Sequence, residues 1–161
     1  YDGEASAEIE AAFQGTSANG KVDRARLGER VIGDAAAIKR LEQIVHPKVT
    51  AASAKFLADA ERAGAPVAVL DVPLLFETGG DKRCDAVVVV SAPADVQRKR
   101  ALERPGMTTD KFAAILGKQM PDEEKRRRAD FVVDTSQGFD HARAQVRDIL
   151  QRVATMPKRR G

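Results

Sequence analysis

An acidic residue at the end of a short apolar run is the first feature that could take part in chemistry. The apolar residues 67–70 end at Asp71, and the segment Pro-Leu-Leu-Phe-Glu at 73–77 follows closely. Open α/β sheets bind ligands beyond the carboxyl ends of their strands, so an acid and a proline turn at this place predict a binding site. The same residues are equally compatible with an aspartate that caps the turn and leucines that fill the core.

Basic side chains form a second constellation, between Arg98 and Arg128. Guanidinium groups suit phosphoryl oxygens, because their N–H donors match the geometry of those oxygens. The opposite interpretation is a solvated helix face, since the acids at 122–124 precede the arginines at 126–128 by four residues. For the run 125–128 alone, the solvated face is the favoured interpretation. The other basic residues of the set are Arg98, Lys99, Arg100, Arg104 and Lys118.

Arg100 differs from the rest of this set by its position. It lies one helical turn before Arg104, on a predicted helix that leaves the ligand-binding end of the sheet. A positioned arginine stabilises charge on a phosphoryl group in transfer, and its removal can cost about a thousandfold in rate. We therefore predict that Arg100 is catalytic. His46, beside Pro47, is either a substrate contact or a helix-capping residue, and the sequence alone slightly favours capping.

The composition predicts one globular domain that binds a small anion. The 161 residues are 43% apolar and 32% charged, with a net charge of +3. Aromatic residues make up only 4% and tryptophan is absent, so few side chains could stack on nucleic-acid bases. We therefore expect a small phosphorylated ligand rather than nucleic acid.

Cysteine content and hydropathy bear on the compartment. Cys84 is the only cysteine, which excludes an intrachain disulfide and a zinc–thiolate cluster and predicts a reducing environment. No apolar run reaches the roughly 18 residues that span a bilayer, and the first residues lack the pattern of a signal peptide. We expect a cytoplasmic monomer without membrane contact.

Three short apolar runs predict strands, at 67–71, 86–90 and 131–133. The second run, Ala-Val-Val-Val-Val, does not alternate, which predicts a parallel sheet with helices on both faces. Strands separated by helices indicate the α/β class. Periodicity and caps predict helices at 5–13, 23–31, 34–45, 47–64, 93–103, 108–119, 121–128 and 140–154, with His46 and Pro47 ending the third.

Several short motifs follow one another in an order that resembles the dephospho-CoA kinases. None is specific alone, but the ordered set spans nearly the whole chain. The motifs are Val-Asp-Arg at 22–24, Ile-Val-His-Pro at 44–47, Asp-Val-Pro-Leu-Leu-Phe-Glu at 71–77, Pro93 with Gln97, Arg100 and Arg104, Gln-Met-Pro at 119–121, Glu-Lys-Arg at 124–126 and Ala-Asp-Phe-Val-Val-Asp at 129–134.

This resemblance implies a P-loop kinase fold, in which helices sandwich a parallel sheet and a helical lid and a helical substrate-side insertion are added. The implied reaction transfers the γ-phosphoryl group of ATP, with Mg²⁺, to the 3′-hydroxyl of dephospho-CoA, the last step of coenzyme A biosynthesis. The implied layout is a helical CoA-side part at 1–64, a core at 65–97 and 129–161, and a lid at 98–128.

The resemblance also implies roles for single residues. Arg100 would be catalytic, and no residue of this chain is expected to bind the metal directly. Substrate binding would involve His46, Asp71, Pro73, Leu74 and Glu77, and nucleotide or lid contacts would involve Arg104, Gln119, Arg126 and Asp134.

Two departures from the family pattern shape the expectation for activity. Thr135 follows Asp134 where the family more often has asparagine, in a loop that would lie near the adenine. The larger departure is the lack of a Gly-x-x-x-x-Gly-Lys-Ser/Thr loop, whose backbone amides, lysine and hydroxyl hold the phosphates and Mg²⁺. We therefore expect an N-terminally truncated chain that lacks the central strand between 67–71 and 86–90 and is inactive alone.

Two other functions compete with this interpretation. Another P-loop nucleoside or small-molecule kinase would share the acid at the strand end and the arginine-rich lid but not the acceptor pocket. A non-enzymic basic module would bind nucleic acid through the 98–128 stretch and the basic tail at 158–160, with steep salt dependence.

Overall fold

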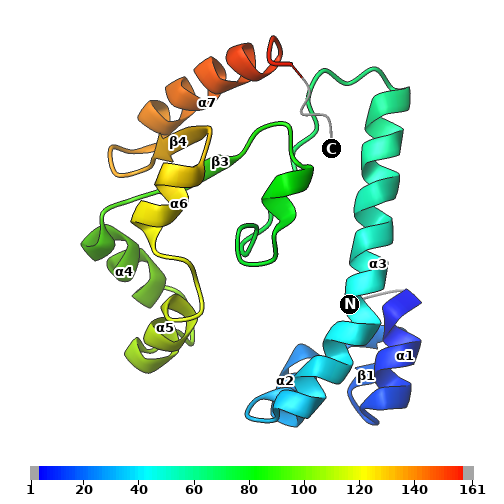
Figure 1. The fold of residues 1–161 in the computed structure, drawn as a ribbon. Helices are drawn as coiled ribbons and strands as arrows, with labels where there is room; N and C mark the ends of the chain where they lie inside the picture. Colours follow the sequence, from blue (N-terminus) through cyan, green and yellow to red (C-terminus); the bar gives the residue numbers. More distant parts are fainter. Residues whose placement is uncertain (1–3, 158–161) are drawn as a thin grey trace. The chain divides into compact units, whose positions relative to one another are not determined.

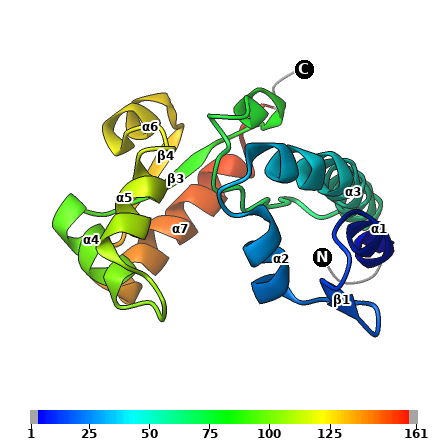
Figure 2. The ribbon, with the colours of Figure 1, turned by 90° about the horizontal axis from the view of Figure 1, so that it is seen from below.

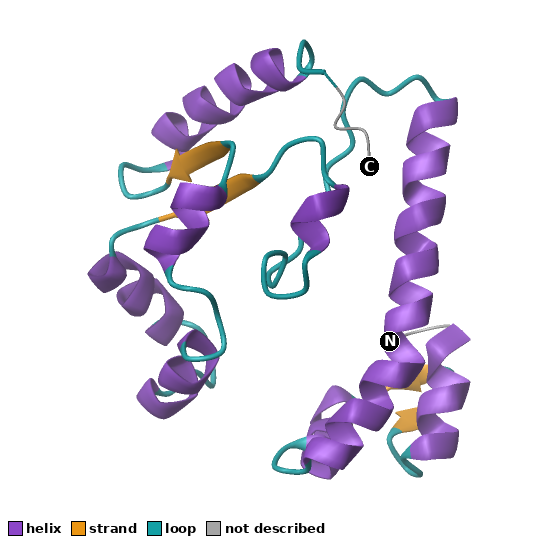
Figure 3. Cartoon of the chain, viewed as in Figure 1, coloured by secondary structure: helices purple, strands orange, loops and turns teal. Residues whose placement is uncertain are grey.

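The computed structural model describes residues 4–157. The chain divides into two compact units, Tyr1–Ala68 and Val69–Gly161, and each is described by itself. The first unit is mainly helical, whereas the second combines helices with a small parallel sheet (Figure 1, Figure 3). The α/β class is therefore confirmed.

In the first unit, two short helices and a hairpin pack against the first half of a long helix. The elements are α1 (Glu4–Ala12), β1 (Ser17–Ala18), β2 (Lys21–Val22), α2 (Arg24–Val31) and α3 (Ala35–Arg62). The buried core side chains are Ile9, Phe13, Val22, Leu27 and Val31, against which Leu41, Ile44 and Val45 of α3 pack.

Aspartates cap two of the helices in this unit, α2 and α3. Asp23 accepts hydrogen bonds from the N–H groups of Ala25 and Arg26 at the start of α2. Asp34 does the same for the first turn of α3. These bonds satisfy N–H groups that have no partner inside the helix, which fixes where each helix begins.

The predicted break at His46 and Pro47 is wrong, because α3 runs through both residues from Ala35 to Arg62. Proline lacks an N–H and therefore removes one intrahelical hydrogen bond, but the loss of one bond does not end a helix whose two flanks are strong helix formers. Alanines are frequent on both sides of Pro47, at 35–37 and at 51–60.

The second unit is built around two parallel strands. β3 (Val88–Ser91) pairs with β4 (Phe131–Asp134), with Val88 opposite Phe131 and Ser91 opposite Asp134. Two of the three predicted strands are thus confirmed. The other elements are η1 (Gly80–Arg83), α4 (Ala94–Leu102), α5 (Thr109–Leu116), α6 (Asp122–Arg128) and α7 (Phe139–Val153).

The predicted strand at 67–71 is not formed, and residues 65–72 have no regular structure. Val69 is 72% exposed and Leu70 is 42% exposed. A strand is held by hydrogen bonds to a neighbouring strand, and β3 and β4 pair only with each other among the described residues. The apolar composition of this run therefore does not by itself produce a buried strand.

Burial along the valine run alternates, contrary to the expectation of two covered faces. Val87 and Val89 are 3% and 8% exposed, whereas Val88 and Val90 are 42% and 67% exposed. The buried face of β3 packs with Phe76 and Met120, and that of β4 packs with α7 through Ile149. Figure 1 shows α7 beside β4, and both views show α4 and α5 side by side (Figure 1, Figure 2).

Candidate functional site

The carboxyl ends of β3 and β4 meet at one edge of the second unit, and the predicted catalytic residue lies at this edge. Ser91 and Asp134 are opposite each other in the last register position of the pair. α4 starts shortly after β3, and the loop 135–138 follows β4. Parallel α/β sheets bind ligands in the crevice outside these strand ends.

Arg100 extends from α4 to the loop after β4. Its Nη1 donates to Thr135 Oγ1 at 3.0 Å, and its Nη2 donates to the Thr135 carbonyl oxygen at 2.8 Å. Thr135 is in turn fixed to β3, because its Oγ1 donates to the Ser91 carbonyl oxygen at 3.1 Å. The structure therefore places an exposed guanidinium group at the carboxyl ends of β3 and β4.

Asp134 begins the loop that Arg100 contacts. Its Oδ1 accepts a hydrogen bond from the Ser136 N–H at 2.7 Å. This bond, the Ser136 side chain and His141 keep the pKa of the Asp134 carboxyl below its ordinary value. The carboxylate is thus ionised at neutral pH and holds the first turn of the loop.

Gln145 contacts the end of β4 in a way that the sequence did not reveal. Its Oε1 accepts from the Asp134 N–H at 3.0 Å, and its Nε2 donates to the Asp134 carbonyl oxygen at 2.9 Å. The side-chain amide on α7 thus binds the backbone of β4 at its last residue as a neighbouring strand would. Nothing in the amphipathic pattern of α7 distinguishes this glutamine from an exposed one.

Glu77 lies in the turn segment 73–79, and its side chain is 18% exposed. Its Oε1 accepts from the Met120 N–H at 2.7 Å and lies 3.3 Å from Lys125 Nζ. Partial burial raises the pKa of the Glu77 carboxyl, but the hydrogen bonds from Met120 and from its own backbone and the charge of Lys125 outweigh it, so the pKa is lowered overall. Lys125 Nζ also approaches Gln119 Oε1, at 3.5 Å.

Within residues 69–157, Arg100 bonds to Thr135 and to none of the other predicted site residues. Arg104, just beyond α4, and Arg126, on α6, have exposed side chains. Asp71 is exposed in the irregular segment before the turn, and Pro73 begins that turn. Leu74 is 40% exposed, and its carbonyl oxygen accepts from Thr78. His46 is exposed on α3, in the first unit.

The described residues offer no metal centre of their own. No cluster of three or more histidine, cysteine, aspartate or glutamate side chains occurs within residues 4–157. Likewise, no helix in this part of the chain is long and apolar enough to cross a membrane.

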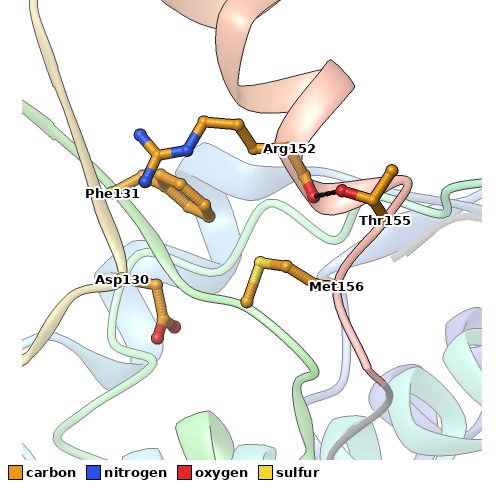
Figure 4. A pocket seen from close by; sticks show the side chains of 5 residues that line it. All are labelled: Asp130, Phe131, Arg152, Thr155 and Met156. Carbon is orange, nitrogen blue, oxygen red and sulfur yellow. Dashed lines mark hydrogen bonds between the residues drawn. The ribbon is translucent and has the colours of Figure 1, made fainter.

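A shallow hollow lies at the opposite end of β4 (Figure 4). The Arg152 guanidinium lies 4.7 Å from the centre of the Phe131 ring, and Asp130 and Met156 point toward the same space. Because Phe131 is the first residue of β4 and Asp134 the last, this hollow is separate from the edge that Arg100 occupies.

Comparison with known proteins gives a consistent result. A family model described as dephospho-CoA kinase matches residues 1–141. A dephospho-CoA kinase from Rhodopseudomonas palustris strain HaA2 is 64% identical over 160 residues, covering 99% of this chain and 80% of the relative. One from Bradyrhizobium diazoefficiens is 62% identical over the same shares of both chains.

Two solved structures have a similar fold. The crystal structure of TT1252 from Thermus thermophilus matches with a TM-score of 0.74 and 30% identity, over 91% of this chain and 74% of that one. The dephospho-CoA kinase from Campylobacter jejuni matches with a TM-score of 0.66 and 27% identity, over 94% and 78% respectively.

Proposed function

This chain belongs to the dephospho-CoA kinase family, and from that premise we propose that Arg100 is the cation that stabilises the phosphoryl group during its transfer. The family activity is the ATP-dependent phosphorylation of dephospho-CoA, a phosphotransferase reaction of coenzyme A biosynthesis. The competing functions, another small-molecule kinase or a nucleic-acid-binding module, are not favoured.

The observation that supports this role is the pair of hydrogen bonds from Arg100 to Thr135. They hold the guanidinium group at the carboxyl ends of β3 and β4, where this class of fold binds its ligands. Charge develops on the phosphoryl oxygens during transfer, and a cation positioned beforehand stabilises that charge without the cost of moving into place. The guanidinium N–H groups of Arg100 that do not bind Thr135 are available to the phosphoryl oxygens.

We propose that the remaining residues divide between the two substrates. His46, Asp71, Pro73 and Leu74 are assigned to the dephospho-CoA side. Arg104, Gln119, Arg126 and Asp134 are assigned to the nucleotide and to a lid at 98–128 that closes over it. Glu77 is assigned to the substrate side by resemblance, and its contacts with Met120 and Lys125 also connect it to the lid.

Mg²⁺ takes part in this proposal as a complex with ATP, and is therefore a component of the substrate. The phosphate groups of ATP supply ligands for this ion. The chain sequence contains no Gly-x-x-x-x-Gly-Lys-Ser/Thr segment to cradle the phosphates. We also propose a cytoplasmic monomer, in agreement with the single cysteine.

The test of the Arg100 role is steady-state kinetics on the protein as its gene encodes it. Arg100→Ala should lower kcat by about a thousandfold and change the KM for dephospho-CoA only a few fold, because the interaction is made in the transition state. Arg98→Ala, on the same exposed helix, is the matched control and should retain its kcat. Turnover by Arg100→Ala at the rate of the control would contradict the proposal.

A further inference from the structure

The carboxylate of Glu77 connects the turn segment 73–79 to the linker between α5 and α6. Its Oε1 accepts from the Met120 N–H at 2.7 Å and lies 3.3 Å from Lys125 Nζ. The Glu77 and Lys125 side chains are only 18% and 16% exposed, so water screens this pair less than a surface ion pair. The bond to Met120 joins a backbone N–H to a charged acceptor, which is among the stronger kinds of hydrogen bond.

Four further contacts hold the chain to the core from Met120 onward. The Met120 side chain packs with the buried cluster that contains Phe76. Ser91 Oγ at the end of β3 lies 2.8 Å from Asp122 Oδ2 in the first turn of α6. At the other end of α6, Arg128 pairs with Asp81 at 3.1 Å and lies 4.6 Å from the Phe76 ring centre. α6 is therefore fixed at both ends.

The chain before Met120 is held much less firmly. α5 packs against α4, whereas α6 packs against β3. Ile115 and Leu116 at the end of α5 are 46% and 45% exposed. The bonds from Arg100 to Thr135 connect α4 to the strands. The change from weakly to strongly held backbone thus falls between Gln119 and Met120.

We propose that Glu77 is a positioning residue that fixes the trailing hinge of the lid at Met120. The moving segment then ends at Gln119, and α6 belongs to the stationary core. This inference rests on the proposed lid at 98–128, and it shortens the part of that lid that moves by placing its end at Gln119. Glu77 acts on the reaction through the lid, by setting the position about which α5 turns when nucleotide binds.

Hydrogen exchange of the protein as its gene encodes it, resolved to single amides, tests the anchor directly. Glu77→Ala should increase exchange at the Met120 amide by about tenfold or more, since a hydrogen bond to a charged group is lost. Glu77→Gln should stay within about threefold of the wild type, because its side-chain oxygen still accepts this bond. Glu103→Gln, an exposed glutamate just after α4, is the control and should change nothing.

Two results of the exchange measurement on Glu77→Ala would contradict the proposed anchor. Unchanged exchange at Met120 in Glu77→Ala would overturn the inference. An equal rise at Met120 and throughout β3 would also overturn it, because that pattern indicates a general loss of stability.

A second measurement tests the proposed hinge and the proposed lid independently. A non-hydrolysable ATP analogue with Mg²⁺ should slow exchange in residues 103–119 and leave residues 120–128 unchanged. If exchange slowed equally in both segments, the proposed hinge at Met120 would be overturned, whereas the proposed lid would stand. Protection of neither would overturn the proposed lid, and this inference with it.

Discussion

At the scale of single residues, several side chains bind backbone groups that lie outside their own helix or turn. Gln145 binds both backbone groups of Asp134, and Glu77 binds the N–H of Met120. Glu10 does the same in the first unit, where its carboxylate accepts from the N–H groups of Gly15 and Ser17. The bond from Gly15, followed by those from Ser17, lowers the pKa of the Glu10 carboxyl.

The contact between Gln145 and Asp134 gives a prediction for nucleotide binding. Gln145→Leu removes two hydrogen bonds and leaves the last backbone groups of β4 without them, so the loop 135–138 should lose its fixed position. Two bonds at about 0.5–1.5 kcal/mol each sum to about 1–3 kcal/mol, which corresponds to a rise of about 5- to 150-fold in the KM for ATP. The kcat should fall as well, because Thr135 in this loop holds Arg100 in place.

Initial rates measured against ATP concentration check this prediction. Gln151→Leu is a matched control, since Gln151 is exposed on the same helix and should tolerate the change. An equal KM for ATP in the two variants would show that Gln145 has no role in positioning the loop.

At the scale of elements, the sequence predicted most helices and two strands, because caps and periodicity are local signals. Asp23, Asp34 and Thr108 cap helices as expected. The hairpin of β1 and β2 was missed although its signal was present: Asn19 and Gly20 have φ values of 53° and 73°, as an Asn-Gly hairpin turn requires.

Strand formation at 67–71 was harder to predict, because it depends on a partner and not on composition. The run is apolar and ends in an acid, but no described strand pairs with it. The alternating burial of the valine run likewise depends on which neighbours pack on each face. Prediction of the candidate site from the sequence is limited in the same way. The position of Arg100 followed from the order of helices and strands, whereas the contacts of Glu77 and Gln145 depend on tertiary packing.

The continuous α3 helix gives a prediction at this scale. Pro47 costs α3 one backbone hydrogen bond, so Pro47→Ala should raise the free energy of unfolding, by about 1–3 kcal/mol. Urea unfolding followed by helical circular dichroism measures this change. Pro157→Ala, outside the helices, should shift the midpoint little. A destabilised Pro47→Ala variant would mean that the proline, and not the helix around it, is required at this position.

At the scale of the whole molecule, the family assignment and the site agree. The ordered motifs, the parallel strand pair and relatives at 64% and 62% identity all indicate a dephospho-CoA kinase. The chain spans 80% of the length of this relative. The residues that hold Arg100 and Glu77 in place, Thr135, Met120 and Lys125, all lie in the second unit.

The most direct test of this account is a coupled assay for phosphorylation of dephospho-CoA by ATP and Mg²⁺, with the product identified as the 3′-phosphorylated coenzyme. The protein as its gene encodes it should form coenzyme A. The 161-residue polypeptide by itself should form none, because it has no loop to cradle the phosphates. No turnover of dephospho-CoA by the gene product would contradict the assigned acceptor, and turnover by the 161-residue polypeptide would contradict the need for that loop.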